Sequence, residues 1–138
     1  MPPIDIKAIV IAFTAELGAD YLIMLLTFSF FAHGMLTPDM TPEEFARIRE
    51  TVFDTTAFLP CLLVLGTMTT ILGAYFAARL AKRIPYYHGL AMGIVGTVFS
   101  LALWRSGATW LDYVGLVTTI PASLYGAHLA RKHMPVES

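Results

Sequence analysis

The stretch IKAIVIAFTAELGADYLIMLLTFSFFA, residues Ile6–Ala32, decides the architecture of this chain. It exceeds the roughly 20 mostly apolar residues that a helix needs to cross the hydrocarbon core of a bilayer. Two acids, Glu16 and Asp20, interrupt it four residues apart, so a helix projects both from one face. Thr27 falls close to the same direction and extends the pair into a narrow polar stripe. Acids at that depth in hydrocarbon are costly, and Glu16, Asp20 and Thr27 are therefore the candidate ion or proton site.

The composition of the whole chain agrees with a lipid environment. Of its 138 residues, 57% are hydrophobic and 14% are charged, whereas a soluble domain carries about a quarter of charged residues. The formal net charge of −1 lacks the clustered excess of Lys and Arg that nucleic-acid binding requires. We therefore expect a membrane protein whose first partner is the lipid bilayer, and no nucleic-acid partner.

Three further segments are long and apolar enough to span a bilayer, namely Thr56–Ala81, Tyr86–Trp104 and Trp110–Ala130. Together with Ile6–Ala32 they predict an all-α membrane protein. We expect residues 1–138 to form a single domain, a four-helix transmembrane bundle that runs up, down, up and down.

The basic residues predict the orientation of this bundle. Six of the nine Lys and Arg residues fall on the side that holds both termini: Lys7, Arg79, Lys82, Arg83, Arg131 and Lys132. The remaining three, Arg47, Arg49 and Arg105, fall on the other side. Because short loops rich in Lys and Arg stay in the cytoplasm, both termini are expected to be cytoplasmic.

The connection between the first two spans carries the signals of a short helix over Pro42–Phe53. Thr41 suits the N-cap and Pro42 the first helical position, while Glu44 completes a capping box. The apolar residues follow at helical spacing, so the helix is amphipathic: Phe45, Ile48 and Val52. It either lies flat on the outer leaflet or covers the bundle as a lid, and the sequence does not separate the two placements.

Small residues at helical spacing indicate where the spans pack against one another. They are Gly73 and Ala77 in the second span, Gly89, Gly93 and Gly96 in the third, and Ala122 and Gly126 in the fourth. Such faces let helix backbones approach closely and associate through van der Waals contacts.

The second and fourth spans also resemble each other at a shift of 49 residues (66 to 115). The shift aligns Gly66, Thr69, Thr70 and Ile71 with Gly115, Thr118, Thr119 and Ile120. Either two helical hairpins arose by duplication, as in many membrane folds, or the likeness arises because membrane helices use few residue types.

Residues 73–79 read GAYFAAR, and His88, Gly89 and Gly93 follow. This pattern resembles that of small four-span bacterial membrane proteins in which it reads GGYxAaR…HGxxxG. The fourth span matches their usual ending through Trp110, Gly115, Pro121, Ala122, Leu129, Ala130 and Arg131. The resemblance implies a multi-pass protein of the bacterial inner (plasma) membrane and places Asp20 where many of those proteins carry an Asp. The family is uncharacterised, so the resemblance implies no activity.

No enzymatic chemistry is indicated by the sequence. It contains no Ser-His-Asp arrangement, phosphate-binding loop or metalloprotease motif, so we expect no catalytic residues and no cofactor. His88 and His128 fall near the same end of the bundle, but two histidines without a third ligand do not predict a metal site. We interpret both as polar groups at the membrane interface.

Two classes of function follow from these features. The first is an accessory or self-associating subunit that acts through helix packing, with further copies of the chain or a larger membrane complex as its partner. The second is a proton- or cation-coupled transporter of small molecules that uses Glu16 and Asp20. If the protein is a transporter, we expect the acids to face a polar cavity. If it is a subunit, we expect either a solid core in which hydroxyls hydrogen-bond the acids or acids that face a partner.

Overall fold

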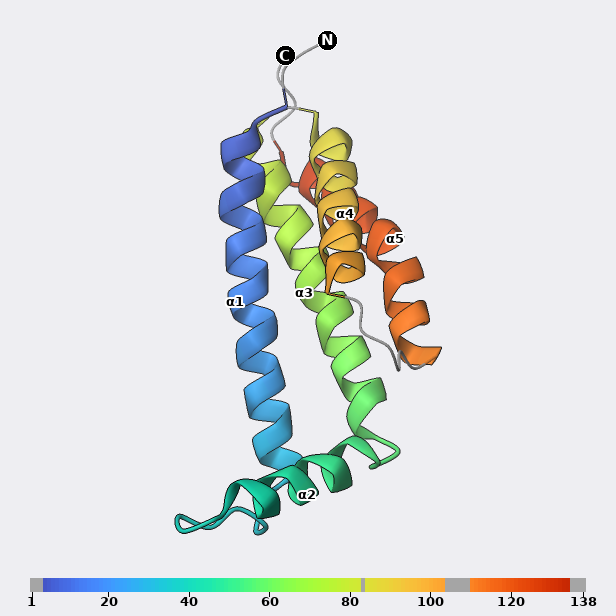
Figure 1. Ribbon diagram of the computed structural model, residues 1–138. Helices are drawn as coiled ribbons and strands as arrows, with labels where there is room; N and C mark the ends of the chain where they lie inside the picture. Colours follow the sequence, from blue (N-terminus) through green and yellow to red (C-terminus); the bar gives the residue numbers. More distant parts are fainter. Residues whose placement is uncertain (1–3, 83, 104–109, 135–138) are drawn as a thin grey trace.

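The computed structural model describes residues 4–82, 84–103 and 110–134, and this part of the chain forms five helices and no strand (Figure 1). The helices are α1 (Ile6–Phe31), α2 (Pro42–Phe53), α3 (Phe58–Ala81), α4 (Pro85–Ala102) and α5 (Trp110–Lys132). The four long ones begin and end within two residues of the apolar segments marked by the sequence. Among the described residues, α1 and α3 are the two helices long and apolar enough to cross a membrane.

α3 is the central helix of the bundle. It packs along α1, α4 and α5, whereas α1 touches α4 at few positions. In Figure 1, α1 begins and α5 ends at the same end of the bundle, while α1 and α3 run beyond α4 to reach α2 at the opposite end. The described chain is therefore four helices thick at one end and consists of α1, α2 and α3 at the other.

The helices meet over glycine and alanine, as the spacing of small residues predicts. A Cβ atom placed on Gly126 of α5 would overlap the carbonyl oxygen of Ile71 on α3. A Cβ placed on Gly89 of α4 would stand 2.5 Å from the Cβ of Ala127 on α5, and one on Gly93 would overlap the Ser123 hydroxyl. The small faces of α4 and α5 are thus used inside the chain, where Ala77 and Ala122 are buried as well.

α2 has the capping box that its sequence predicts. The Thr41 amide donates to Glu44 Oε2 at 2.8 Å, and the Glu44 amide donates to Thr41 Oγ1 at 3.3 Å. The apolar face of α2 packs on Ala32 and Phe58, and Val52 is 1% exposed there. α2 therefore covers the ends of α1 and α3. Because it crosses them (Figure 1), the same placement lays it parallel to any membrane surface that they would cross.

His88 joins the start of α4 to the start of α1, and its side chain is wholly buried. The Asp5 amide donates to His88 Nε2 at 3.0 Å, and His88 Nδ1 lies 3.2 Å from the Ile84 carbonyl oxygen. Since an amide only donates, Nε2 must accept, and Nδ1 must carry the proton that Ile84 receives. His88 is therefore not an exposed polar group, because its ring bridges two backbone segments inside the protein.

Replacing His88 tests this bridge. We expect His88→Met to lower the free energy of unfolding by about 1–3 kcal/mol, because the Asp5 amide loses its acceptor inside the protein. His88→Gln keeps an acceptor oxygen on a side chain of matched length and should lose clearly less. Unfolding in mixed detergent micelles measures both variants, and equal losses for Met and Gln would contradict the assignment.

The contact between α3 and α5 provides a second test. Gly126→Ala should destabilise the protein by about 1–3 kcal/mol, because the methyl group meets the rigid Ile71 backbone. Gly66→Ala is the matched control, since a Cβ there meets nothing within 4 Å. We expect this control to be neutral or stabilising by up to about 1 kcal/mol through helix propensity. Similar losses for both variants in the same unfolding assay would speak against close packing at Gly126.

Candidate functional site

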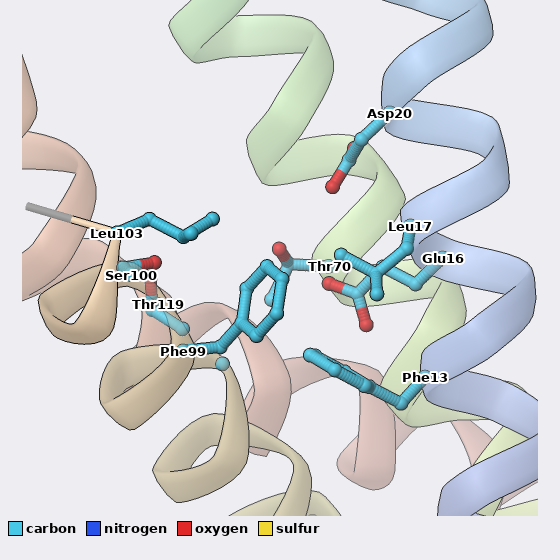
Figure 2. Close-up of a pocket in the computed structure, with 10 residues that line it drawn as sticks. Phe13, Glu16, Leu17, Asp20, Thr70, Phe99, Ser100, Leu103 and Thr119 are labelled. Atoms are coloured by element: carbon cyan, nitrogen blue, oxygen red, sulfur yellow. The ribbon is translucent and has the colours of Figure 1, made fainter.

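A pocket of about 220 Å³ lies between α1 and the end of α4, where the two helices have few contacts (Figure 2). α1 contributes Phe13, Glu16, Leu17 and Asp20, α3 contributes Thr70, α5 contributes Thr119, and the α4 side contributes Gly96, Phe99, Ser100 and Leu103. Phe99, Ser100 and Leu103 are exposed, so this side forms an accessible rim.

Glu16 and Asp20 both line the pocket, as their four-residue spacing on one helix face predicts. Figure 2 shows the two carboxyls on the α1 side and Phe99, Ser100 and Leu103 on the α4 side. Both acids are half-buried, and none of the described residues that line the pocket is basic. The acids are held by hydroxyls instead.

Each carboxyl has a threonine partner on α3. The Thr70 side chain hydrogen-bonds the Glu16 carboxyl, and the Thr69 hydroxyl donates to Asp20 Oδ1. A hydroxyl is a donor and an acceptor at once, so it suits a carboxyl in either protonation state.

Thr69 shows how both protonation states of Asp20 are accommodated. Its hydroxyl lies 2.7 Å from the Gly66 carbonyl oxygen as well as beside Asp20, yet it has one hydrogen to donate. When Asp20 is ionised, that hydrogen is given to the carboxylate. When Asp20 is protonated, the acid donates to Thr69, and Thr69 donates to Gly66. The Thr69 hydroxyl and Asp20 Oδ1 therefore remain hydrogen-bonded to each other in either state.

Gly73 makes room for Glu16. A Cβ atom on Gly73 would overlap Glu16 Oε2 and would stand 3.0 Å from Glu16 Cδ. Gly73 was singled out by the sequence as a helix-packing residue, and the structure gives it a second role. Its missing side chain allows the Glu16 carboxyl to lie against the backbone of α3 at the edge of the pocket.

Phe13 from the α1 side of the pocket meets Phe99 from the α4 side. Phe13 and Phe99 meet edge to face, with ring centroids 5.5 Å apart and an interplanar angle of 82°. Thr119 on α5 adds a hydroxyl, which donates to the Gly115 carbonyl oxygen at 2.9 Å and keeps its lone pairs as acceptors. The pocket thus combines carboxyls, hydroxyls and an aromatic pair.

Thr27 does not join this site. It is buried on α1 and is not among the residues that line the pocket, because it lies seven residues beyond Asp20, or roughly 10 Å along the helix. Gly96, assigned to helix packing, does line the pocket, and its missing Cβ leaves space beside Thr119 Cγ2.

Sequence reasoning missed Phe13, Thr70, Phe99, Ser100 and Thr119 as lining residues. One signal pointed to two of them: the shift of 49 residues aligns Thr70 with Thr119, and both face the pocket. At the same shift, the Thr69 hydroxyl donates to the Gly66 carbonyl oxygen and the Thr118 hydroxyl donates to the Gly115 carbonyl oxygen. α3 and α5 therefore present corresponding hydroxyls to one cavity.

Comparisons with protein-family models, with curated proteins and with solved structures found no match to this chain. What the protein does must be inferred from the chemistry of this pocket.

Proposed function

We propose that the protein is a multi-pass protein of the bacterial inner membrane, in which α1, α3, α4 and α5 cross the bilayer. The support is the apolar surface of its longest helices. Val10, Leu22, Leu26 and Phe30 of α1 are all more than half exposed, the last at 77%. A core helix of a soluble protein would bury most of such side chains, and water would meet a large apolar patch.

The distribution of charge supports cytoplasmic termini. Lys7, Arg79, Lys82, Arg131 and Lys132 lie at the end of the bundle where α1 begins and α5 ends (Figure 1). The opposite end carries α2, whose acidic residues accompany its two arginines. Under the positive-inside rule, the first end faces the cytoplasm.

In this arrangement the pocket lies near the middle of the bilayer. α1 has 26 residues and is about 39 Å long at 1.5 Å per residue, somewhat longer than a hydrocarbon core of about 30 Å. Glu16 and Asp20 are about 15 Å and 21 Å from its first residue by the same rise. Neither end of the helix brings these acids close to bulk water.

We infer that the protein is a small proton-coupled cation transporter, with Glu16 and Asp20 as the shared site for the proton and the substrate. The observation that carries this proposal is the convergence of both acids on a hydroxyl-lined pocket at mid-depth, with no basic residue among the described lining residues. Intramembrane acids in such positions mark ion and proton pathways.

The alternative, a subunit that associates through its glycine faces, has less support. Gly89, Gly93 and Gly126 already contact neighbouring helices of the same chain, so these faces are not free for a partner. The acids also face a cavity, which a purely structural role for them does not require.

The chemistry of coupling follows from competition for the same oxygens. A cation binds the carboxyls in their ionised form, and a proton binds them in its place. Thr69 can donate to either Gly66 or Asp20, so the protonated Asp20 carboxyl keeps a hydrogen bond to Thr69. Cation binding must therefore release protons and must strengthen as the pH rises.

Proton release tests the transporter directly. Purified protein in weakly buffered detergent, followed with a pH dye, is titrated with NaCl, KCl and n-butylammonium chloride. We expect at least one salt to release protons in a saturable manner. Glu16→Gln should abolish most of this release and Asp20→Asn should reduce it, while Asp54→Asn outside the pocket is the control. If no salt releases protons from the parent protein, the proposal fails.

Gly73→Ala tests the position of Glu16 without changing an acid. The added methyl group should displace the Glu16 carboxyl. We expect the cation concentration at half-maximal proton release to rise about tenfold. Gly18→Ala, on α1, is the matched control, because a Cβ there meets nothing within 4 Å. Glu16→Asp in the Gly73→Ala background shortens the acid and should restore part of the response. An unchanged response in Gly73→Ala would show that this contact does not position Glu16.

A further inference from the structure

The size of the pocket limits what it can hold. Its volume of about 220 Å³ corresponds to roughly seven water molecules at about 30 Å³ each. Pockets for drug-sized ligands begin at about 300 Å³. A pocket of this size suits a small molecule of a few non-hydrogen atoms better than a drug-sized one.

The oxygens of the pocket suit a bare metal ion poorly. Calcium binds six to eight oxygens at about 2.3–2.6 Å, arranged around one point. Here one carboxyl oxygen is bonded to Thr69, and Thr70 is bonded to Glu16. Within the described residues no group of three His, Cys, Asp or Glu side chains converges as metal ligands would.

The aromatic pair suits an organic cation. Phe13 and Phe99 both line the pocket and meet edge to face, so the aromatic rings lie beside the acids in the same cavity. The face of an aromatic ring attracts an ammonium group within about 6 Å of the centroid. Leu17 and Leu103 add apolar surface for a short hydrocarbon part.

We propose that the substrate of this pocket is a short primary alkylammonium, with its charged head between the acids and the Phe13–Phe99 pair. The proposal rests on the transporter function proposed above and names its substrate class. A primary ammonium offers three N–H donors, and Glu16, Asp20 and the Thr119 hydroxyl offer acceptors. The alkyl part lies against Leu17, Leu103 and the rings. No covalent bond forms, and the head group replaces the proton on the acids.

The test compares ligands of matched shape. Binding of n-butylammonium to the purified protein in lipid nanodiscs is measured by calorimetry, beside the neutral isostere 1-butanol and the salts NaCl and KCl. We expect n-butylammonium to bind, to release protons, and to bind at least tenfold more tightly than the other three. Equal or tighter binding of 1-butanol, Na⁺ or K⁺ would overturn the proposal.

Phe99→Leu isolates the contribution of the aromatic ring. Phe99 is 38% exposed at the rim of the pocket, so leucine there preserves apolar bulk without opening a core. We expect n-butylammonium to bind about tenfold more weakly to Phe99→Leu, the size of a partly desolvated cation–π contact. Phe30→Leu, at an exposed phenylalanine outside the pocket, is the control, and thermal unfolding verifies that both variants are folded. The same affinity in both variants would refute the aromatic contact.

The two proposals fail in different ways. Proton release by Na⁺ or K⁺, with none by n-butylammonium, would leave a proton-coupled cation transporter and remove the alkylammonium. The absence of proton release with all salts would remove the transporter and the alkylammonium together.

Discussion

The close approach of α3 to its neighbours is the constraint on which the rest of the structure depends. α3 contacts α1, α4 and α5 over much of its length, and two glycines at these contacts have no room for a side chain. Gly126 brings α5 against the Ile71 backbone, and Gly73 accepts the Glu16 carboxyl of α1. The absence of a side chain at these glycines therefore allows the helices to pack closely and gives the Glu16 carboxyl its place against α3. In lipid, where apolar surface gains little by burial, such contacts are the main source of helix association.

The pocket holds two acids that have no cationic partner among its described lining residues. They lie four residues apart on an apolar helix. The threonines of α3 hydrogen-bond them, and Phe99 lies across the cavity, edge to face with Phe13 of α1. Hydroxyls stabilise a carboxyl in both of its protonation states, whereas a lysine or arginine would hold it ionised. This composition is the basis of the proposed proton exchange.

Much of the fold followed from local sequence. Helical spacing, apolar length and the capping box at Thr41 act over a few residues, so the five helices and the shared face of Glu16 and Asp20 were predictable. The opposite wall was not, because Phe99 and Thr119 reach the acids only once α4 and α5 are placed beside α1 and α3. Thr27 was assigned to the site by its direction on the helix wheel, but α4 ends before its level. The backbone bridge made by His88 was not predictable, because its partners, Asp5 and Ile84, meet only in the folded chain.

The unequal lengths of α1 and α4 have a consequence for the surrounding lipid. α4 has 18 residues and is about 27 Å long, roughly 12 Å shorter than α1. In the proposed arrangement, the bilayer thins locally beside the short α4, while the longer α1 tilts to fit the hydrocarbon core. The pocket extends from the level of the acids to the end of this short helix, where Phe99 and Leu103 form its rim. Bilayer thickness thereby becomes a determinant of access, because a thicker membrane buries this rim more deeply in hydrocarbon and a thinner one brings it toward the headgroups.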